Sequence, residues 1–209
     1  MKNYVVEFIG TFFLVLVIGL TVIEPGGAGA MAPLAIGTTL MVMVYAGGHI
    51  SGGHYNPAVT LAVWMRGKCD TKDVAPYMIS QILGGVVAAF VVKFCKPDAV
   101  VTAATPDVAR AVLNELLFTF ALCYVVLNTA TSKKNAGNSY YGLAIGFTVL
   151  AGAYAGGAIS GGAYNPAVAC GISTMGLSTW PNIWIFLVGN FAGAALAATI
   201  YKMANPGEF

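Results

Sequence analysis

The sequence predicts an all-α membrane protein with six transmembrane helices and two re-entrant half-helices, arranged as an inverted repeat. Three observations lead to this fold class: low charge, six long apolar stretches, and one phrase that occurs twice. Of the 209 residues, 58% are hydrophobic and only 9% are charged, whereas soluble domains average about 25% charged residues. The mean hydropathy is +0.78. A chain so poor in charge could hardly cover a water-exposed surface, so it is expected to lie in a membrane.

The six apolar stretches are close to the roughly 20 residues that a helix needs to cross a bilayer. Turn-forming segments separate them, such as EPGG near residue 24 and SKKNAGN near residue 132. The first stretch resembles a signal peptide but has no small-residue cleavage site, so we expect it to be retained. The stretches cover residues 4–23, 33–48, 74–94, 109–128, 140–156 and 181–203.

Two further apolar segments, 56–66 and 165–175, are too short to cross. About ten residues of helix span only ~15 Å of a hydrocarbon core that is ~30 Å thick. Each segment follows a version of one phrase, GHISGGHYNPAV ending at Val59 and GAISGGAYNPAV ending at Val168. Both are therefore predicted to be half-helices that enter the membrane and turn back.

The repeat extends beyond this phrase and divides the chain into two halves, residues 1–100 and 108–209. Glu7 in EFIGTFFLVL corresponds to Glu115 in ELLFTFALCY, at nearly the same offset that separates the two phrases. Each half holds three crossing helices. Because three is odd, the second half enters the membrane from the opposite side, which makes an inverted repeat whose related sites meet near the midplane. The two halves together are expected to form a single domain.

The distribution of Lys and Arg predicts the orientation, because cytoplasmic loops carry an excess of both. With the N-terminus inside, three basic residues lie outside, namely Lys93, Lys96 and Arg110. Seven lie inside, namely Lys2, Arg66, Lys68, Lys72, Lys133, Lys134 and Lys202. We therefore expect both termini to be cytoplasmic, in an inner or plasma membrane.

The two SGGxYNPA loops are built to open half-helices inside the membrane. Their glycines permit unusual backbone dihedrals, Asn is a favoured N-cap, and Pro suits the first helical position. The positive ends of the two half-helices would then face each other at the centre, with Asn56 and Asn165 offering amide donors. Such a site suits a neutral molecule that donates and accepts hydrogen bonds, and it opposes cations. The pattern indicates a passive pore for uncharged solutes.

Other classes of function find no support in the sequence. A net charge of +2 does not suggest a nucleic-acid partner. The four cysteines have no CxxC spacing, and no nucleophile–base pair, metal cluster or phosphate-binding fingerprint occurs. We expect neither an enzyme nor a cofactor or metal; the expected partners are water, small uncharged solutes and the lipid bilayer.

From end to end the chain resembles the aquaporin, or major intrinsic protein, family, with both NPA motifs complete (Asn56, Pro57, Ala58 and Asn165, Pro166, Ala167). The resemblance implies a channel that assembles as a homotetramer. It implies that Glu7 and Glu115 accept hydrogen bonds from the re-entrant loops, although an intramembrane acid is also a candidate proton carrier. It further implies that loop carbonyls line the pore, at Gly52, Gly53, His54, Gly161, Gly162 and Ala163.

The chain departs from the family at the outer constriction. In most members of the family that the chain resembles, four residues form this constriction. They are an arginine directly after the second NPA motif, an aromatic residue on the second helix, commonly a histidine on the fifth helix, and a loop residue. By this resemblance the four positions fall on Ile36, Ala153, Gly162 and Val168. A wide apolar constriction is therefore expected, open to solutes such as glycerol, urea or ammonia-like molecules. The glycerol branch carries Arg-Asp after this motif, so Val168-Ala169 matches neither branch.

Three alternatives remain open from the sequence. Arg110, just before the fourth crossing helix, could swing in to replace the missing arginine, or it could be a solvated loop charge. The chain could be an ion-coupled secondary transporter, since broken helices in inverted repeats also occur there, but the central stretches offer only His49 and His54 and no Asp, Glu, Lys or Arg. It could also be a structural membrane protein of the same fold that conducts poorly.

Overall fold

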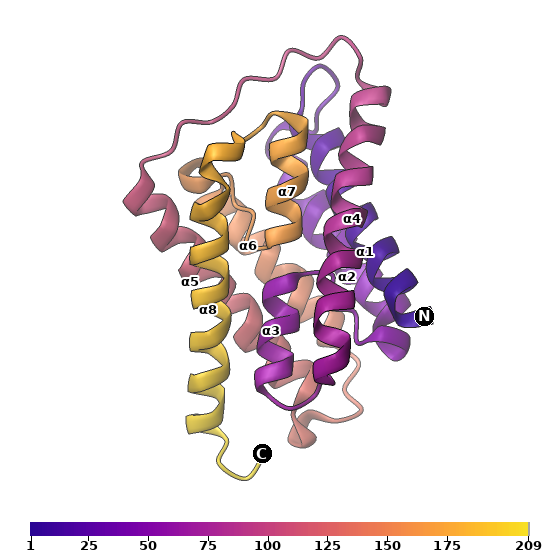
Figure 1. Ribbon diagram of the computed structural model, residues 1–209, viewed down its shortest axis with the longest axis vertical. Coiled ribbons are helices and arrows are strands. Elements are labelled where there is room, and N and C mark those ends of the chain that lie inside the picture. The colour runs from indigo at the N-terminus through magenta and orange to yellow at the C-terminus, as the bar shows by residue number, and fades with distance from the viewer. Residues whose placement is uncertain (209) are drawn as a thin grey trace.

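The computed structural model describes residues 1–208, which form a bundle of six long helices around two short ones (Figure 1). Six helical segments in these residues are long and apolar enough to span a membrane, which confirms the predicted class. The long helices are α1 (Lys2–Val22), α2 (Ala32–Ser51), α4 (Thr71–Cys95), α5 (Val108–Val126), α6 (Tyr141–Ser160) and α8 (Ile183–Ala204). Short helical turns precede or follow several of them, at Gly29–Met31, Leu127–Thr131, Lys133–Asn135 and Trp180–Asn182.

Two long helices extend further than the hydrophobic pattern indicates. We expected the second and fifth crossing helices to end at residues 48 and 156, but α2 and α6 continue to Ser51 and Ser160. Each ends only where a glycine adopts the left-handed conformation, Gly52 at φ +89° and Gly161 at φ +92°. Glycine takes this conformation without the steric penalty of a Cβ.

The two short helices are α3 (Pro57–Met65) and α7 (Pro166–Met175). Their N-caps, Asn56 and Asn165, have extended backbones, and each side chain accepts a hydrogen bond from the first turn of its own helix. Proline follows as the first helical residue, where its missing N–H removes no hydrogen bond. Both half-helices therefore begin as their sequences predict.

The two halves of the chain pack in matching ways. Helix α1 lies against α4, and its counterpart α5 lies against α8; α2 and α6 contact each other. Each half-helix also reaches into the other half, since α3 packs on α8 and α7 packs on α4. Figure 1 shows α3 in the lower half of the molecule and α7 in the upper half, with their N-termini toward the middle. This crossed packing connects the two halves.

The bundle has two distinct ends. The segment between α4 and α5 crosses the upper end in Figure 1, and the C-terminal tail lies at the lower end. We call these the α4–α5 end and the α5–α6 end. Asn3 and Thr131 border one pocket at the α5–α6 end, so α1 begins where α5 and its terminal turn finish. Helices α1 and α5 therefore run in opposite directions, as an inverted repeat requires.

Glycines allow the closest helix contacts. A Cβ on Gly84 of α4 would lie 2.5 Å from the Phe8 carbonyl oxygen of α1, and one on Gly193 of α8 would lie 2.5 Å from the Leu116 carbonyl oxygen of α5. At Gly85 the obstacle is the Ala167 carbonyl oxygen of α7, 2.7 Å away. Backbone cannot yield as a flexible side chain can, so small residues at these positions are a condition of the packing.

Candidate functional site

The site is built from the two loops that precede the half-helices. In the first loop Gly52, Gly53 and Tyr55 all have positive φ, at +89°, +63° and +51°. The second loop repeats this conformation at Gly161, Gly162 and Tyr164. Positive φ is unfavourable for a tyrosine, so the surrounding contacts must hold both loops in place.

One buried carboxylate organises the first loop. The Glu7 carboxylate accepts hydrogen bonds from the Ser51 hydroxyl at 2.6 Å, the His54 backbone N–H at 3.0 Å and the Tyr55 backbone N–H at 2.6 Å. The Gln81 side-chain amide donates a fourth, at 2.7 Å. Glu7 is fully buried. Four donors replace the water that the carboxylate loses, and together they fix the loop to α1, α2 and α4.

Glu115 repeats the arrangement on the second loop, donor by donor. Its oxygens accept from the Ser160 hydroxyl at 2.6 Å and from the backbone N–H groups of Ala163 at 3.0 Å and Tyr164 at 2.7 Å. The Asn190 amide supplies the fourth hydrogen bond, at 2.7 Å. Each carboxylate therefore accepts hydrogen bonds from two loop N–H groups and two helix side chains, and neither glutamate lines the central cavity. This geometry favours the loop-supporting role over that of a proton carrier.

The tyrosines of the two loops add a second set of anchors. The Tyr55 hydroxyl donates to the Met43 carbonyl at 2.9 Å, and the Tyr164 hydroxyl donates to the Gly152 carbonyl at 2.8 Å. On the first loop, Tyr77 also donates to the Ser51 carbonyl at 2.7 Å. These hydrogen bonds attach the two loops to the interiors of α2 and α6, and Tyr77 attaches the end of α2 to α4.

The two loops meet through their asparagines. The Asn56 amide donates to the Tyr164 carbonyl at 2.9 Å, and the Asn165 amide donates to the Tyr55 carbonyl at 2.8 Å. A side-chain amide has two N–H groups, so one on each asparagine is left to face a solute. Both residues border the central cavity. The expected pair of donors at the centre is thus present, and it is locked by reciprocal bonds that the sequence did not indicate.

A cavity of about 330 Å³ extends from the α4–α5 end past this asparagine pair. Among the described residues that line it there is no Asp, Glu, Lys or Arg. Loop backbone and the two asparagines form its polar side. Aliphatic side chains form most of the rest, including Leu14, Ile18, Leu40, Val59, Leu122, Val126, Ile145, Val149 and Ile172. The lining offers a short run of hydrogen-bonding groups against an apolar wall.

The predicted loop and NPA residues differ in whether they reach the cavity. The predicted loop residues line the cavity with the exception of Gly52, which borders a pocket at the α5–α6 end instead. In the NPA motifs only the asparagines line the cavity; the prolines and alanines are buried at the starts of α3 and α7. His54 lines the cavity, and its Nδ1 lies 3.1 Å from the Thr60 hydroxyl, so its ring is anchored.

The four positions of the predicted constriction also border this cavity. Ile36 of α2, Ala153 of α6, Gly162 and Val168 come from four separate elements and line the same space. Arg110 does not line it: the residue is exposed in the first turn of α5, where its backbone N–H donates to the Asp107 side chain. In this structure Arg110 does not take the place of the missing arginine.

Several residues of the site were not predicted. Ser51 and Ser160 complete the carboxylate contacts, and their equivalent places in the repeated phrase were the available signal. Gln81 and Asn190 occupy equivalent positions in the two halves, and no sequence pattern indicates that both donate to a carboxylate. Thr102 of the α4–α5 segment also lines the cavity, and no sequence pattern pointed to it.

The fold and the cavity define a class of protein, a passive channel that crosses the membrane. Two opposed half-helices direct their positive ends to the centre of an uncharged cavity, and this arrangement admits neutral solutes. A passive channel moves solutes without changing them chemically, so this class of protein is not an enzyme class.

Comparison with known proteins places this channel in a family. Residues 1–201 match the profile of the Major intrinsic protein family. The chain is 36% identical to aquaporin TIP1-2 of Zea mays over 99% of its own length and 87% of that protein, and 39% identical to aquaporin TIP1-1 of Arabidopsis thaliana over 86% and 72%. The aquaglyceroporin of Plasmodium falciparum has the same fold, with a TM-score of 0.80 at 22% identity over 99% of this chain and 98% of that one. The chain belongs to the major intrinsic protein family.

The role of the buried carboxylates can be tested with Glu7→Gln. The substitution replaces one acceptor oxygen by an amide donor, which then faces groups that also donate. Each buried donor left without an acceptor costs about 1–3 kcal/mol. We therefore expect a markedly lower unfolding temperature in detergent and a lower yield of folded protein. Glu24→Gln is the matched control because Glu24 is exposed in the α1–α2 loop. Equal stability of the two variants would contradict the assigned role.

Proposed function

We propose that this channel conducts water together with larger neutral solutes, such as glycerol and urea, through a wide apolar constriction at Ile36, Ala153, Gly162 and Val168. The observation that carries the proposal is the convergence of these four residues on one cavity whose described lining has no charged side chain. Gly162 has no side chain and Ala153 has only a methyl group, so the ring leaves more space than one closed by an arginine and aromatic rings.

The polar side of the cavity supports the choice of neutral, hydrogen-bonding solutes. Glycerol and urea carry hydroxyl or amide groups that can use the loop carbonyls and the asparagine donors, while their remaining surface contacts the aliphatic wall. A cation would meet the converging positive ends of α3 and α7 without a compensating carboxylate. Exclusion of ions then depends on the centre of the channel and not on the constriction.

The two alternatives lack a supporting observation. An ion-coupled transporter needs an ionisable group on the solute path, and among the described lining residues only His54 and two tyrosines titrate. A poorly conducting structural protein would need an obstructed path, whereas the cavity has a volume of about 330 Å³. Osmotic water flux into proteoliposomes that does not depend on an imposed ion gradient would contradict both alternatives.

The width of the constriction is tested by Val168→Arg. A guanidinium at this position would narrow the ring and add a fixed positive charge. We expect glycerol and urea permeability to fall by roughly tenfold, which corresponds to ~1.4 kcal/mol of added barrier, while water still passes. Stopped-flow light scattering of proteoliposomes measures all three rates.

Val100→Arg is the matched control, because Val100 is 91% exposed in the α4–α5 segment and does not line the cavity. If wild-type protein passes water alone, or if Val168→Arg leaves every permeability unchanged, the four residues are not the selective constriction.

The same proposal includes an orientation in an inner or plasma membrane with both termini cytoplasmic. Its support is the excess of basic residues at the α5–α6 end, seven against three. Two native cysteines, one near each end of α4, can test this orientation. Cys95 is exposed at the C-terminus of α4, at the α4–α5 end, and Cys69 is partly buried before the start of α4. A membrane-impermeant maleimide added to intact cells should label Cys95.

The label should disappear in Cys95→Ser and persist in Cys69→Ser. Burial raises the pKa of the Cys69 thiol, so its reaction in opened vesicles should also be slow, because the thiolate is the reactive form. Loss of the label in Cys69→Ser and its retention in Cys95→Ser would place the termini outside.

We further propose a homotetramer, with family membership as its support. Each chain encloses its own cavity, so assembly adds contacts between lipid-facing surfaces without being needed to form the pore. Light scattering of the purified protein, corrected for detergent, should give four times the chain mass of 21.6 kDa. A mass equal to one or two chains would contradict the assembly.

A further inference from the structure

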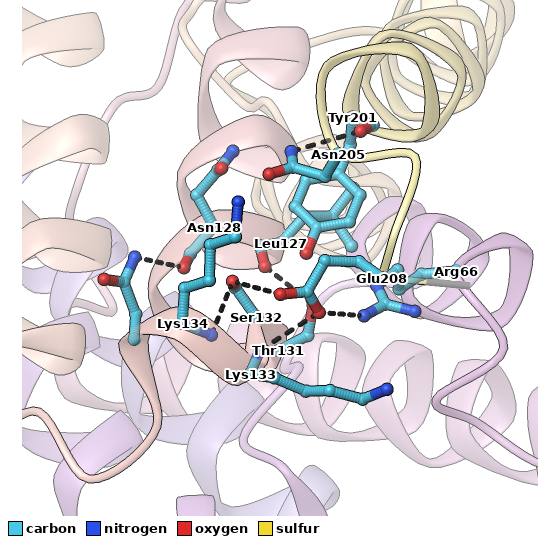
Figure 2. A network of polar contacts seen from close by, with 11 residues as sticks. Arg66, Leu127, Asn128, Thr131, Ser132, Lys133, Lys134, Tyr201, Asn205 and Glu208 are labelled. Atoms are coloured by element: carbon cyan, nitrogen blue, oxygen red, sulfur yellow. Dashed lines mark hydrogen bonds and ion pairs between the residues drawn. The ribbon is translucent and has the colours of Figure 1, made fainter.

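Polar side chains are also buried away from the two loop-supporting carboxylates, and one cluster of them attaches the C-terminal tail. Glu208 of the tail is 4% exposed, and its carboxylate accepts hydrogen bonds from three groups at the α5–α6 end (Figure 2). These are the Arg66 guanidinium at 2.9 Å, the Ser132 hydroxyl at 3.0 Å and the Lys133 backbone N–H at 3.1 Å. None of these four residues lines the central cavity. The cluster holds the tail and takes no part in the proposed constriction.

Another buried polar group, the side-chain amide of Asn114 in α5, contacts the elements that form the constriction. Asn114 is 6% exposed. Its amide nitrogen donates to the Ser160 hydroxyl at 2.8 Å, the Gly156 carbonyl at 3.1 Å and the Tyr164 hydroxyl at 3.3 Å. The two N–H groups of the amide are thus divided among three acceptors. One side chain joins α5 to the last turns of α6 and to the loop that follows α6.

The Ser160 hydroxyl connects this amide to the constriction. It donates to the Glu115 carboxylate at 2.6 Å, and it accepts from the backbone N–H of Gly162 at 3.1 Å as well as from Asn114. A hydroxyl has one proton and two lone pairs, so all of its hydrogen-bonding capacity is used. Gly162 is one of the four constriction residues. A second one, Ala153, lies on α6, the helix that the amide also bonds.

The first half of the chain carries a valine where the second half carries this asparagine. Val6 and Asn114 each directly precede the loop-supporting glutamate of their half. A Cβ on Gly47 would lie 2.6 Å from Val6 Cγ1, and one on Gly156 would lie 2.7 Å from Asn114 Nδ2, so the two side chains occupy equivalent places. Valine fills this place without any donor. The packing therefore does not require an amide, and the asparagine adds only hydrogen bonds.

This difference between the halves matches a difference between the two loops. Only the second loop and its half-helix contribute residues to the proposed constriction, Gly162 and Val168, and only the second loop is bonded by an amide at this place. Because Gly162 has no side chain, the space on its side of the ring depends on where its backbone lies. Its φ is +64°, and Tyr164 also has a positive φ. Contacts from outside the loop must therefore keep that backbone in position.

We propose that Asn114 is a positioning residue that fixes the width of the constriction and so sets the largest neutral solute that the channel passes, a role that rests on the proposed function. By bonding α6 and the second loop at once, its amide keeps the backbone of Gly162 at a constant distance from the other residues of the ring. Without the amide the loop moves over a wider range, and polyols longer than glycerol enter more often. Water is small enough to pass in both cases.

Asn114→Val tests this role with the residue that the first half carries at the equivalent place. In proteoliposomes we expect the permeability to erythritol, relative to that of water, to rise roughly fivefold, the factor that corresponds to one hydrogen bond of ~1 kcal/mol. The ratio of two permeabilities does not depend on the amount of folded protein. A residue that only stabilises the fold would therefore leave the ratio unchanged.

Val6→Ala is the matched control, because it loosens the equivalent contact on the loop that contributes nothing to the constriction. Removing buried methyl groups should lower the unfolding temperature, while the ratio of erythritol to water permeability should stay at the wild-type value. A ratio that rises as much in Val6→Ala as in Asn114→Val would overturn the assigned role.

Tyr164→Phe provides a second variant that tests the same contacts. It removes the hydroxyl that accepts from Asn114 and donates to the Gly152 carbonyl. We expect it to raise the same ratio. The double variant with Asn114→Val should change the ratio by less than the product of the two single effects, because both substitutions act on one set of contacts.

Val168→Arg, measured in parallel, separates the role of Asn114 from the constriction itself. If Val168→Arg lowers glycerol permeability while Asn114→Val and Tyr164→Phe leave the erythritol ratio unchanged, Asn114 does not position the constriction, although the constriction is correctly placed. If Val168→Arg leaves every permeability unchanged, the four residues are not the constriction, and the role of Asn114 is contradicted as well.

Discussion

The structure depends on the burial of two carboxylates that supply acceptors where the membrane supplies none. Non-helical backbone at membrane depth must have its N–H groups satisfied by protein or by water in a cavity. Glu7 and Glu115 each take two backbone N–H groups of a loop, one hydroxyl and one amide. These contacts use N–H groups of the loops and none of the loop carbonyls, which we propose line the solute path. Without the carboxylates the loops could not keep their strained dihedrals, and the half-helices would lose their position.

The reciprocal hydrogen bonds of the two asparagines connect the two loops at the centre of the channel. Asn56 and Asn165 each cap their own half-helix and bond the opposite loop, so neither loop can shift without the other. The central donors are therefore preorganised for a passing solute. In the proposed function the selective constriction is formed by other residues, Val168 among them, which can vary while the centre stays fixed.

Much of the architecture follows from local sequence. The six crossing helices, the two half-helices and the asparagine caps are visible because length, apolarity, Asn-Pro and glycine act over a few neighbouring residues. Helix ends were less well predicted: α2 and α6 continue to Ser51 and Ser160, since only the left-handed glycines that follow stop them. The roles of Gln81 and Asn190 were not predicted, because they depend on carboxylates that are distant in sequence.

The sequence by itself determined that this is a membrane channel with an inverted repeat and with a valine directly after its second NPA motif. Tertiary structure decided which groups meet. It brought Ile36, Ala153, Gly162 and Val168 around one cavity, kept Arg110 outside it, and placed Glu208 against Arg66. The physical reason is that periodicity and helix propensity are local, whereas a cavity wall or a buried ion pair is assembled from segments separated by many residues. Only the packing of the helices specifies which of those segments lie together.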